Sequence, residues 1–204
     1  MKKLVALIAI GVIFLAVSAQ ASYIAYDVQK DVITDNIGTG TSGMLFSTNQ
    51  ALYVTALGYF DAHGNGFNFS HDVGIYDTTT HSLIASATVN SGDTIINYFR
   101  YVSLAKPLLL SANTSYFLVG FDQIGDAQNT PEWSSVTIAP QITSLGYFYS
   151  TTPSGLAYPT IPYGTPYFGP NAEFQTVPEP AAILLFGLGL LGLAVLRRKF
   201  KKSN

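Results

Sequence analysis

The sequence has no cysteine and very few basic residues between its two ends. The missing cysteine excludes disulfides, thiolate metal sites and cysteine nucleophiles. Residues 22–175 carry three basic side chains (Lys30, Arg100 and Lys106) against eleven acidic ones, a formal charge of −8. Such an acidic surface repels phosphate backbones, so nucleic-acid binding is not expected. The length of 204 residues fits one ordinary domain plus targeting segments.

The N-terminal residues have the three parts of a secretory signal peptide. Lys2 and Lys3 give the positive start, and residues 4–17 form an uncharged apolar run. Ala19 and Ala21 provide a small-x-small cleavage site, which predicts a signal peptide over 1–21 and a mature chain that starts at Ser22. The alternative is an N-terminal anchor that is not cleaved.

The C-terminal residues predict a single transmembrane helix over about 180–196. Residues 181–196 contain no charged or polar side chain, and a helix of that length spans about 24 Å. Pro180 suits a first helical turn. The basic tail at 197–202 should remain cytoplasmic by the positive-inside rule, which places the middle of the chain outside. Its charged residues are Arg197, Arg198, Lys199, Lys201 and Lys202.

The same end carries a recognisable pattern. Val177-Pro178-Glu179-Pro180 precedes a Gly- and Leu-rich apolar stretch and a basic tail, and this order over 177–204 resembles the PEP-CTERM sorting signal. In that family the Pro-Glu-Pro motif marks substrates of a membrane-bound exosortase. The resemblance implies exosortase and the inner membrane as partners. It also implies export, an intermediate anchored in the inner membrane with its ectodomain outside the cytoplasm, and then release or attachment at the cell surface or in the extracellular matrix.

Residues 22–175 should form the folded domain, and their pattern predicts an all-β fold. Short runs of β-branched and aromatic residues alternate with turn-forming clusters, without a convincing amphipathic helix. Many short strands at this spacing favour an antiparallel β-sandwich. Residues 116–121 are apolar on both faces, which indicates a central strand, and Pro107 should mark a strand edge or bend. Strands are expected at 22–26, 43–46, 52–60, 71–76, 82–89, 98–104, 115–121, 136–138, 145–149 and 172–175.

A second resemblance concerns this domain. The runs 54–60, 71–77, 83–89, 99–102 and 109–120 occur in an order similar to an uncharacterised jelly-roll-like β-sandwich domain of exported bacterial proteins. Phe168-Gly169-Pro170-Asn171, before the sorting motif, looks like the last strand of such proteins. The resemblance implies an antiparallel jelly-roll-like sandwich, but no activity and no catalytic residues.

Aromatic residues crowd a Pro- and Gly-rich segment between Tyr147 and Phe168. With few charges nearby, such rings can stack against sugars while polar side chains hydrogen-bond the hydroxyls. The alternative is a long loop whose rings pack inward against the sandwich. The candidate glycan contacts are Trp133, Tyr158, Tyr163 and Tyr167.

One Gly-rich loop is rich in oxygen ligands, which suit Ca²⁺. The candidates are Asp61, Asn65, Asn68 and Asp72. The spacing lacks the EF-hand ladder, and Asp, Asn and Gly are also common turn residues, so an ordinary turn is the alternative. His63, His71 and His81 lack the spacing of known zinc sites and are expected at the surface or in turns. No other cofactor is expected.

Catalysis has little support in the sequence. Residues 40–44 (Gly-Thr-Ser-Gly-Met) fail the G-x-S-x-G pattern at the last position, and the pair Glu132 and Glu173 cannot be judged without a distance. We therefore expect a non-catalytic cell-surface or matrix protein that binds exopolysaccharide. The alternatives are a purely structural envelope component and, with less support, a secreted glycan hydrolase.

Overall fold

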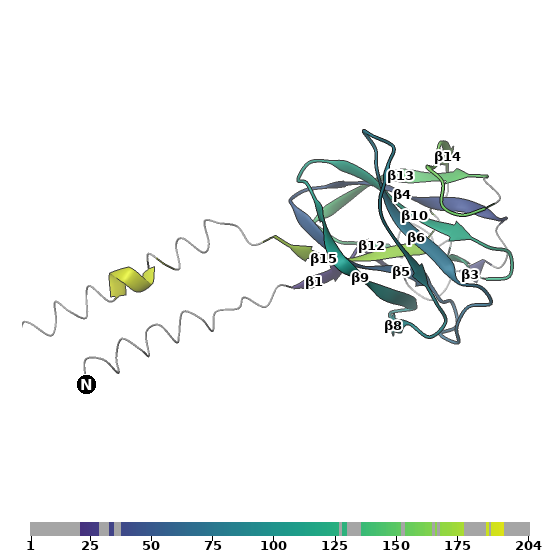
Figure 1. Ribbon diagram of the computed structural model, residues 1–204, viewed down its shortest axis with the longest axis horizontal. Coiled ribbons are helices and arrows are strands. Elements are labelled where there is room, and N and C mark those ends of the chain that lie inside the picture. The colour runs from purple at the N-terminus through teal and green to yellow at the C-terminus, as the bar shows by residue number, and fades with distance from the viewer. Residues whose placement is uncertain are drawn as a thin grey trace, which may run out of the picture. The chain divides into compact units, whose positions relative to one another are not determined.

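A computed structural model describes residues 21–28, 33–34, 38–126, 128–129, 136–151, 154–164, 166, 168–177, 187 and 189–193. Its strands all lie within one compact unit, Ser22–Glu179, here called the β domain (Figure 1). The predicted signal peptide (1–20 of its 21 residues), Pro178–Pro180 and the basic tail lie outside the described residues.

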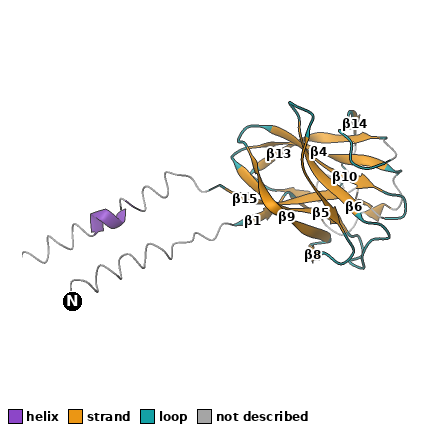
Figure 2. Ribbon diagram, in the orientation of Figure 1, coloured by secondary structure: helices purple, strands orange, loops and turns teal. Residues whose placement is uncertain are grey.

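Two antiparallel sheets make up most of the β domain (Figure 2). The five-stranded sheet has the order β1 (Ser22–Ile24), β15 (Pro170–Thr176), β5 (Leu52–Phe60), β9 (Phe99–Leu110) and β8 (Thr94–Ile96). The six-stranded sheet has the order β14 (Ile161–Tyr163), β13 (Ile142–Ser150), β4 (Gly40–Thr48), β10 (Ser115–Asp122), β6 (His71–Asp77) and β7 (Leu83–Val89). Two short pairs complete the set: β2 (Tyr26–Val28) with β12 (Val136–Ile138), and β3 (Ile33–Thr34) with β11 (Gln128–Asn129).

The order of the strands is that of a jelly roll. Taken in chain order, β1, β4, β5, β6, β7, β9, β10 and β15 divide into the rows 1-8-3-6 and 2-7-4-5, the arrangement of two interlocked Greek keys. Strands β13 and β14 extend the second row beyond β4, and β8 extends the first beyond β9. The chain is therefore a β-rich antiparallel sandwich.

The main core lies between the two sheets. Alternate residues of each strand point inward because side chains alternate across a pleated strand. Contacts across the layers include Tyr59 of β5 stacked on His71 of β6, with ring centroids 3.7 Å apart, and Phe46 of β4 near Phe174 of β15 at 6.0 Å. All four side chains are at most 1% exposed.

The stretch Phe168-Gly169-Pro170-Asn171 leads into β15, and the structure shows what its residue types contribute there. Phe168 packs against Tyr26, with ring centroids 4.4 Å apart. Asn171 is fully buried, and its amide donates to the Tyr26 carbonyl (2.8 Å) while its side-chain oxygen accepts the Ala172 N–H (2.8 Å). A side chain at Gly169 would meet the Tyr59 ring at 3.0 Å. Phe168, Gly169 and Asn171 therefore each serve close packing around the start of this strand.

The strand β9 is longer than the sequence indicated. It continues through Pro107 to Leu110, because its register against β5 shifts from Ala56↔Ser103 to Val54↔Leu108. Residues 104–107 have no register partner on β5, so the missing N–H of Pro107 breaks no ladder there. The short strands β3, β8, β11 and β14 were not predicted, although the equally short β12 has the expected bounds 136–138.

The predicted transmembrane helix falls largely outside the described residues. Residues 187 and 189–193 are helical. Within the part of the chain that the structure describes, no helix is long and apolar enough to cross a membrane.

Candidate functional site

The outer face of the six-stranded sheet carries a second, smaller apolar cluster. Phe117 and Leu118 follow one another on β10 and point to opposite faces, so Leu118 joins the main core and Phe117 joins the outer cluster. Tyr76 and Val119 are the other buried members. A strand that is apolar on both faces needs other residues to cover its outer face as well as its inner one. The apolar run 116–121 in the sequence already indicated this.

Residues 154–160, here called the strap, provide that cover. The hydroxyl of Thr41 on β4 accepts the Ala157 N–H (3.0 Å) and donates to the Gly155 carbonyl (3.2 Å). Leu156 lies over Gly74 of β6, where an added Cβ would meet its side chain at 2.9 Å. Gly74 and Gly43 are both register partners of Val119. Because glycine has no side chain, there is room on the outer face of the sheet on both sides of Val119. The strap comes close to the sheet at Gly74.

Tyr158 fixes the end of the strap by aromatic contacts. Its ring meets Tyr76 edge-on at 5.6 Å and Phe117 edge-on at 5.2 Å, and it stacks on His81 at 4.2 Å. Partial burial raises the pKa of the Tyr158 hydroxyl, which is neutral at physiological pH even at its ordinary value of about 10. His81 adopts a positive φ of 56° in the turn after β6. Asp77 holds this turn by accepting the Thr79 and Thr80 N–H groups (both 2.8 Å), which lowers the pKa of its carboxyl.

Beside the strap lies an uncharged trough of about 390 Å³. It contains three apolar side chains from the sheet, and the strap supplies Tyr158, Pro159 and Thr160. The hydroxyl of Thr78 donates to the Ser115 carbonyl (2.9 Å) at the rim. No lining residue is charged, and the full set is Leu45, Thr78, Ser115, Phe117, Phe148, Tyr158, Pro159 and Thr160.

The structure separates the predicted glycan contacts. Tyr158 lies on the outer face, beside the trough. Tyr163 on β14 is the register partner of Tyr147, and register partners lie on the same face of a sheet. Because Tyr147 points into the main core, Tyr163 lies on the inner face, opposite to Tyr158. It is 38% exposed and meets the ring of Tyr149 edge-on at 5.6 Å. Trp133 and Tyr167 lie outside the described residues.

Three of the four predicted calcium ligands line one cavity of about 160 Å³, namely Asp61, Asn65 and Asn68. Asp72 does not line it, and its carboxylate accepts the Thr88 hydroxyl (2.6 Å) between β6 and β7. Asp61 is 2% exposed, and its Oδ2 accepts Arg100 Nε (2.6 Å) and the Gly66 N–H (2.9 Å). The guanidinium already balances the charge of this carboxylate. The Ca²⁺ site stays a prediction.

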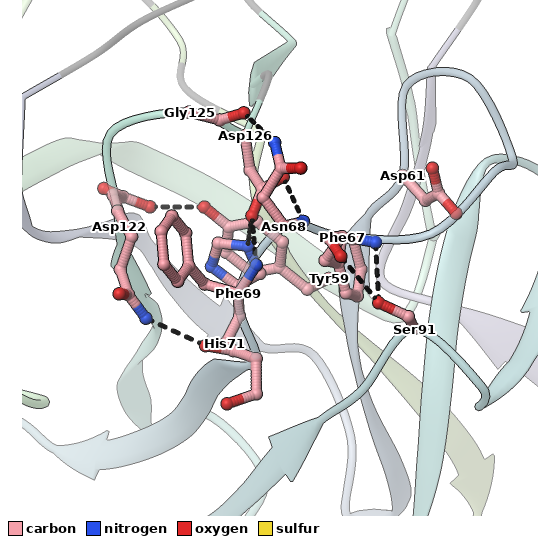
Figure 3. Close-up of polar contacts among 12 residues, drawn as sticks. Tyr59, Asp61, Phe67, Asn68, Phe69, His71, Ser91, Asp122, Gly125 and Asp126 are labelled. Atoms are coloured by element: carbon pink, nitrogen blue, oxygen red, sulfur yellow. Dashed lines mark hydrogen bonds and ion pairs between the residues drawn. The ribbon is translucent and has the colours of Figure 1, made fainter.

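A polar network around the buried His71 lies at the side of this cavity (Figure 3). The carboxylate of Asp126 accepts the Asn68 N–H (2.7 Å) and the Phe69 N–H (3.0 Å), and it lies 3.1 Å from His71 Nε2. The other ring nitrogen of His71 lies 3.0 Å from the Phe121 carbonyl. Burial lowers the pKa of His71, against the opposing effect of Phe121 and Asp126. Asp126 thereby ties the loop after β10 to the loop before β6.

The expectation that His71 lies at the surface or in a turn is wrong, since it is fully buried. The sequence could have indicated this burial, because His71 alternates with Val73 and Ile75, and all three lie on the inward face of β6. His63 and His81 are exposed in turns. Among the described residues, no group of three His, Cys, Asp or Glu side chains could hold a metal ion.

Two of the residues weighed for catalysis, Ser42 and Glu173, lie within strands of the β domain. Ser42 is 4% exposed within β4, where it pairs with Gly120, so residues 40–44 are a strand. Glu173 lies on β15, and partial burial raises its pKa; Glu132 lies outside the described residues.

The β domain leads directly into the C-terminal signal. Strand β15 ends at Thr176, and the Val177 N–H donates to the Ala51 carbonyl (3.4 Å). Residues 176–199 match a family model described as the PEP-CTERM protein-sorting motif. The chain carries a PEP-CTERM sorting motif. This motif indicates an exosortase-targeted protein and implies export through a membrane-anchored sorting intermediate. No curated protein sequence matches the chain.

Proposed function

We propose that this exosortase-targeted protein is a non-catalytic component of the cell surface or extracellular matrix that binds a neutral exopolysaccharide in the trough beside Tyr158. The observation that carries the proposal is the chemistry of that trough. Aromatic and aliphatic side chains from the sheet lie beside hydroxyl groups at the rim, without a charged residue in the lining.

The two kinds of group suit the two faces of a sugar. The C–H face of a pyranose ring packs on aromatic side chains such as Phe117, Phe148 and Tyr158, and a few placed hydroxyls orient its own hydroxyls. A charged polysaccharide would lose hydration in this trough without gaining an opposite charge. A neutral glycan therefore fits better than an acidic one.

A second candidate function is that of a purely structural envelope component. The contacts of Tyr158 with Tyr76, Phe117 and His81 favour it, because they hold the strap on the sheet. In that case the rings stabilise the fold and recognise no ligand.

A binding experiment on three single variants separates the two functions. Tyr158→Ala should weaken binding of the host cell's own exopolysaccharide, or of a neutral glycan from a panel, by about thirtyfold, the equivalent of about 2 kcal/mol for an aromatic anchor. Thr160→Trp should block the trough while leaving the strap contacts of Tyr158 in place. Tyr163→Ala is the matched control, because this exposed tyrosine faces the other side of the sheet.

Thermal unfolding of each variant completes the experiment. If the parent protein binds no glycan, and Tyr158→Ala lowers only the melting temperature, the structural function replaces the binding function. Loss of binding in Thr160→Trp at an unchanged melting temperature supports the trough as the site.

A further inference from the structure

The chain leaves the β domain for the sorting motif at one end of the sandwich. Three loops at this end are here called the exit platform: 49–51, 111–114 and 139–141. They join β4 to β5, β9 to β10, and β12 to β13. Strand β15 ends beside them, and the Val177 N–H donates to the carbonyl of Ala51 in the first loop (3.4 Å).

Hydrogen bonds between the loops hold the exit platform together. The Asn49 N–H donates to the Gln141 carbonyl (2.8 Å), and the Asn49 side-chain amide donates to the Pro140 carbonyl (3.0 Å). The Asn113 N–H donates to the carbonyl of Thr48, the last residue of β4 (2.8 Å). The three loops therefore form one braced surface next to the end of β15.

The exit platform carries no charged side chain, although residues 22–175 have a formal charge of −8. Acidic residues lie in the loops at the opposite end of the sandwich, after β5, β7 and β10, where Asp61, Asp93 and Asp126 are found. The turn between β6 and β7, at the exit end, contains Asp77, whose carboxylate accepts two backbone N–H groups of its own turn.

The sorting motif follows the exit platform without a spacer. Pro178 is the next residue after Val177, and the family match begins at Thr176, the last residue of β15. Because an extended chain advances at most about 3.6 Å per residue, Pro180 lies within about 11 Å of Val177. An enzyme that encloses the motif therefore reaches the loops around Val177, unless β15 separates from β1 and β5. The fully buried side chain of Phe174 opposes that separation.

We propose that the exit platform is a docking surface for the sorting enzyme, which reads Pro178-Glu179-Pro180 together with the platform while β15 stays paired. A site that binds the Glu179 carboxylate offers it hydrogen-bond donors or a positive charge, and no acid in the three loops competes with Glu179 for that site. The docking is independent of glycan binding, because none of the trough-lining residues lies in the three loops.

Bulky substitutions test the docking in the full chain, expressed in cells that contain the sorting enzyme. Gln50→Trp and Ala112→Trp place a large ring at exposed positions of the platform. Each should slow conversion of the precursor to the processed form about fivefold, a typical loss for one interface residue. Ile124→Trp is the matched control, because this residue is 57% exposed in the loop after β10, at the opposite end. Pulse–chase labelling measures the conversion, and limited proteolysis of the same chains checks the fold.

A spacer gives an independent readout. A flexible Gly/Ser segment of about twelve residues between Val177 and Pro178 has a mean reach of about 20 Å and separates the motif from the platform. It should slow processing of the parent chain about fivefold and remove the effect of Ala112→Trp. This pattern supports the docking. Unchanged or faster processing with the spacer, equal processing of the three tryptophan variants, or an effect of Ala112→Trp that persists in the spacer chain would each overturn it.

Discussion

Ser22 lies directly opposite Gln175 in the antiparallel pair of β1 and β15. The first residue of the predicted mature chain is thus a neighbour of the last strand before the sorting motif. On its other side β15 pairs with β5, from Pro170↔Tyr59 to Thr176↔Leu52. The strand that leads to the sorting motif is therefore a central strand of the sandwich.

Two truncations should behave very differently. A chain of residues 22–177 keeps all of β15 and should be a soluble, β-rich domain with cooperative thermal unfolding. A chain of residues 22–171 loses Ala172 and Phe174, both fully buried, and leaves β1 and β5 without their shared neighbour. Circular dichroism and thermal unfolding measure the contrast. Aggregation of the longer chain under native conditions would place the domain boundary elsewhere.

The stability of the domain should depend on pH through His71. Burial lowers the pKa of this imidazole in the folded state below its ordinary value of 6.5. The unfolded chain therefore takes up the proton first, and the contribution of neutral His71 is present above pH 6.5 and lost as pH falls through the lower folded pKa. Denaturant unfolding should give falling stability between about pH 7 and 5.

The variant His71→Asn should be less stable, and it should lose most of this pH dependence. NMR titration of the His71 ring protons in the parent domain measures the pKa of this imidazole in the folded state directly. A midpoint at or above 6.5 would contradict the expected direction.

Removal of Arg100 should destabilise the fold through Asp61. The Arg100 guanidinium also donates to the Asp93 carbonyl (3.0 Å) and the Gly64 carbonyl (3.2 Å). Arg100→Met leaves the buried Asp61 carboxylate without its cation and should cost about 3 kcal/mol of unfolding free energy. The double variant with Asp61→Asn should be clearly more stable than Arg100→Met alone. Additive losses in this cycle would show that the pair is not coupled.

A methyl group at Gly43 should damage the six-stranded sheet. An added Cβ would lie 2.8 Å from Val119 Cα and would also meet the Leu118 carbonyl, both backbone atoms of β10 that cannot move aside. Gly43→Ala should cost about 3 kcal/mol. Gly92→Ala is the control, with no atom within 4 Å of the added carbon, and it should change stability by less than about 0.5 kcal/mol. Similar melting temperatures for the two variants would contradict the close approach at Gly43.

Local patterns were sufficient for some of the strands. Leu52–Phe60 and the three-residue Val136–Ile138 have the bounds expected from β-branched and aromatic runs between turn residues, and the run 116–121 is the centre of its sheet. The strands β4 and β13 are longer than the expected 43–46 and 145–149, and the three-residue strands β8 and β14 were missed. The aromatic segment was recognised, but its division between two faces followed from the register of β13, in which Tyr147 points inward and Phe148 outward.

The sequence by itself determined the sorting motif, the all-β class and the absence of thiol chemistry, because each depends on residue types in a local order. The tertiary structure decided what lies together across long separations. His71 and Asp126 are 55 residues apart and share one network, and Thr41 holds the strap at Gly155 and Ala157. Pairing between distant strands sets such contacts through register and packing, and neither is encoded in a short stretch of sequence.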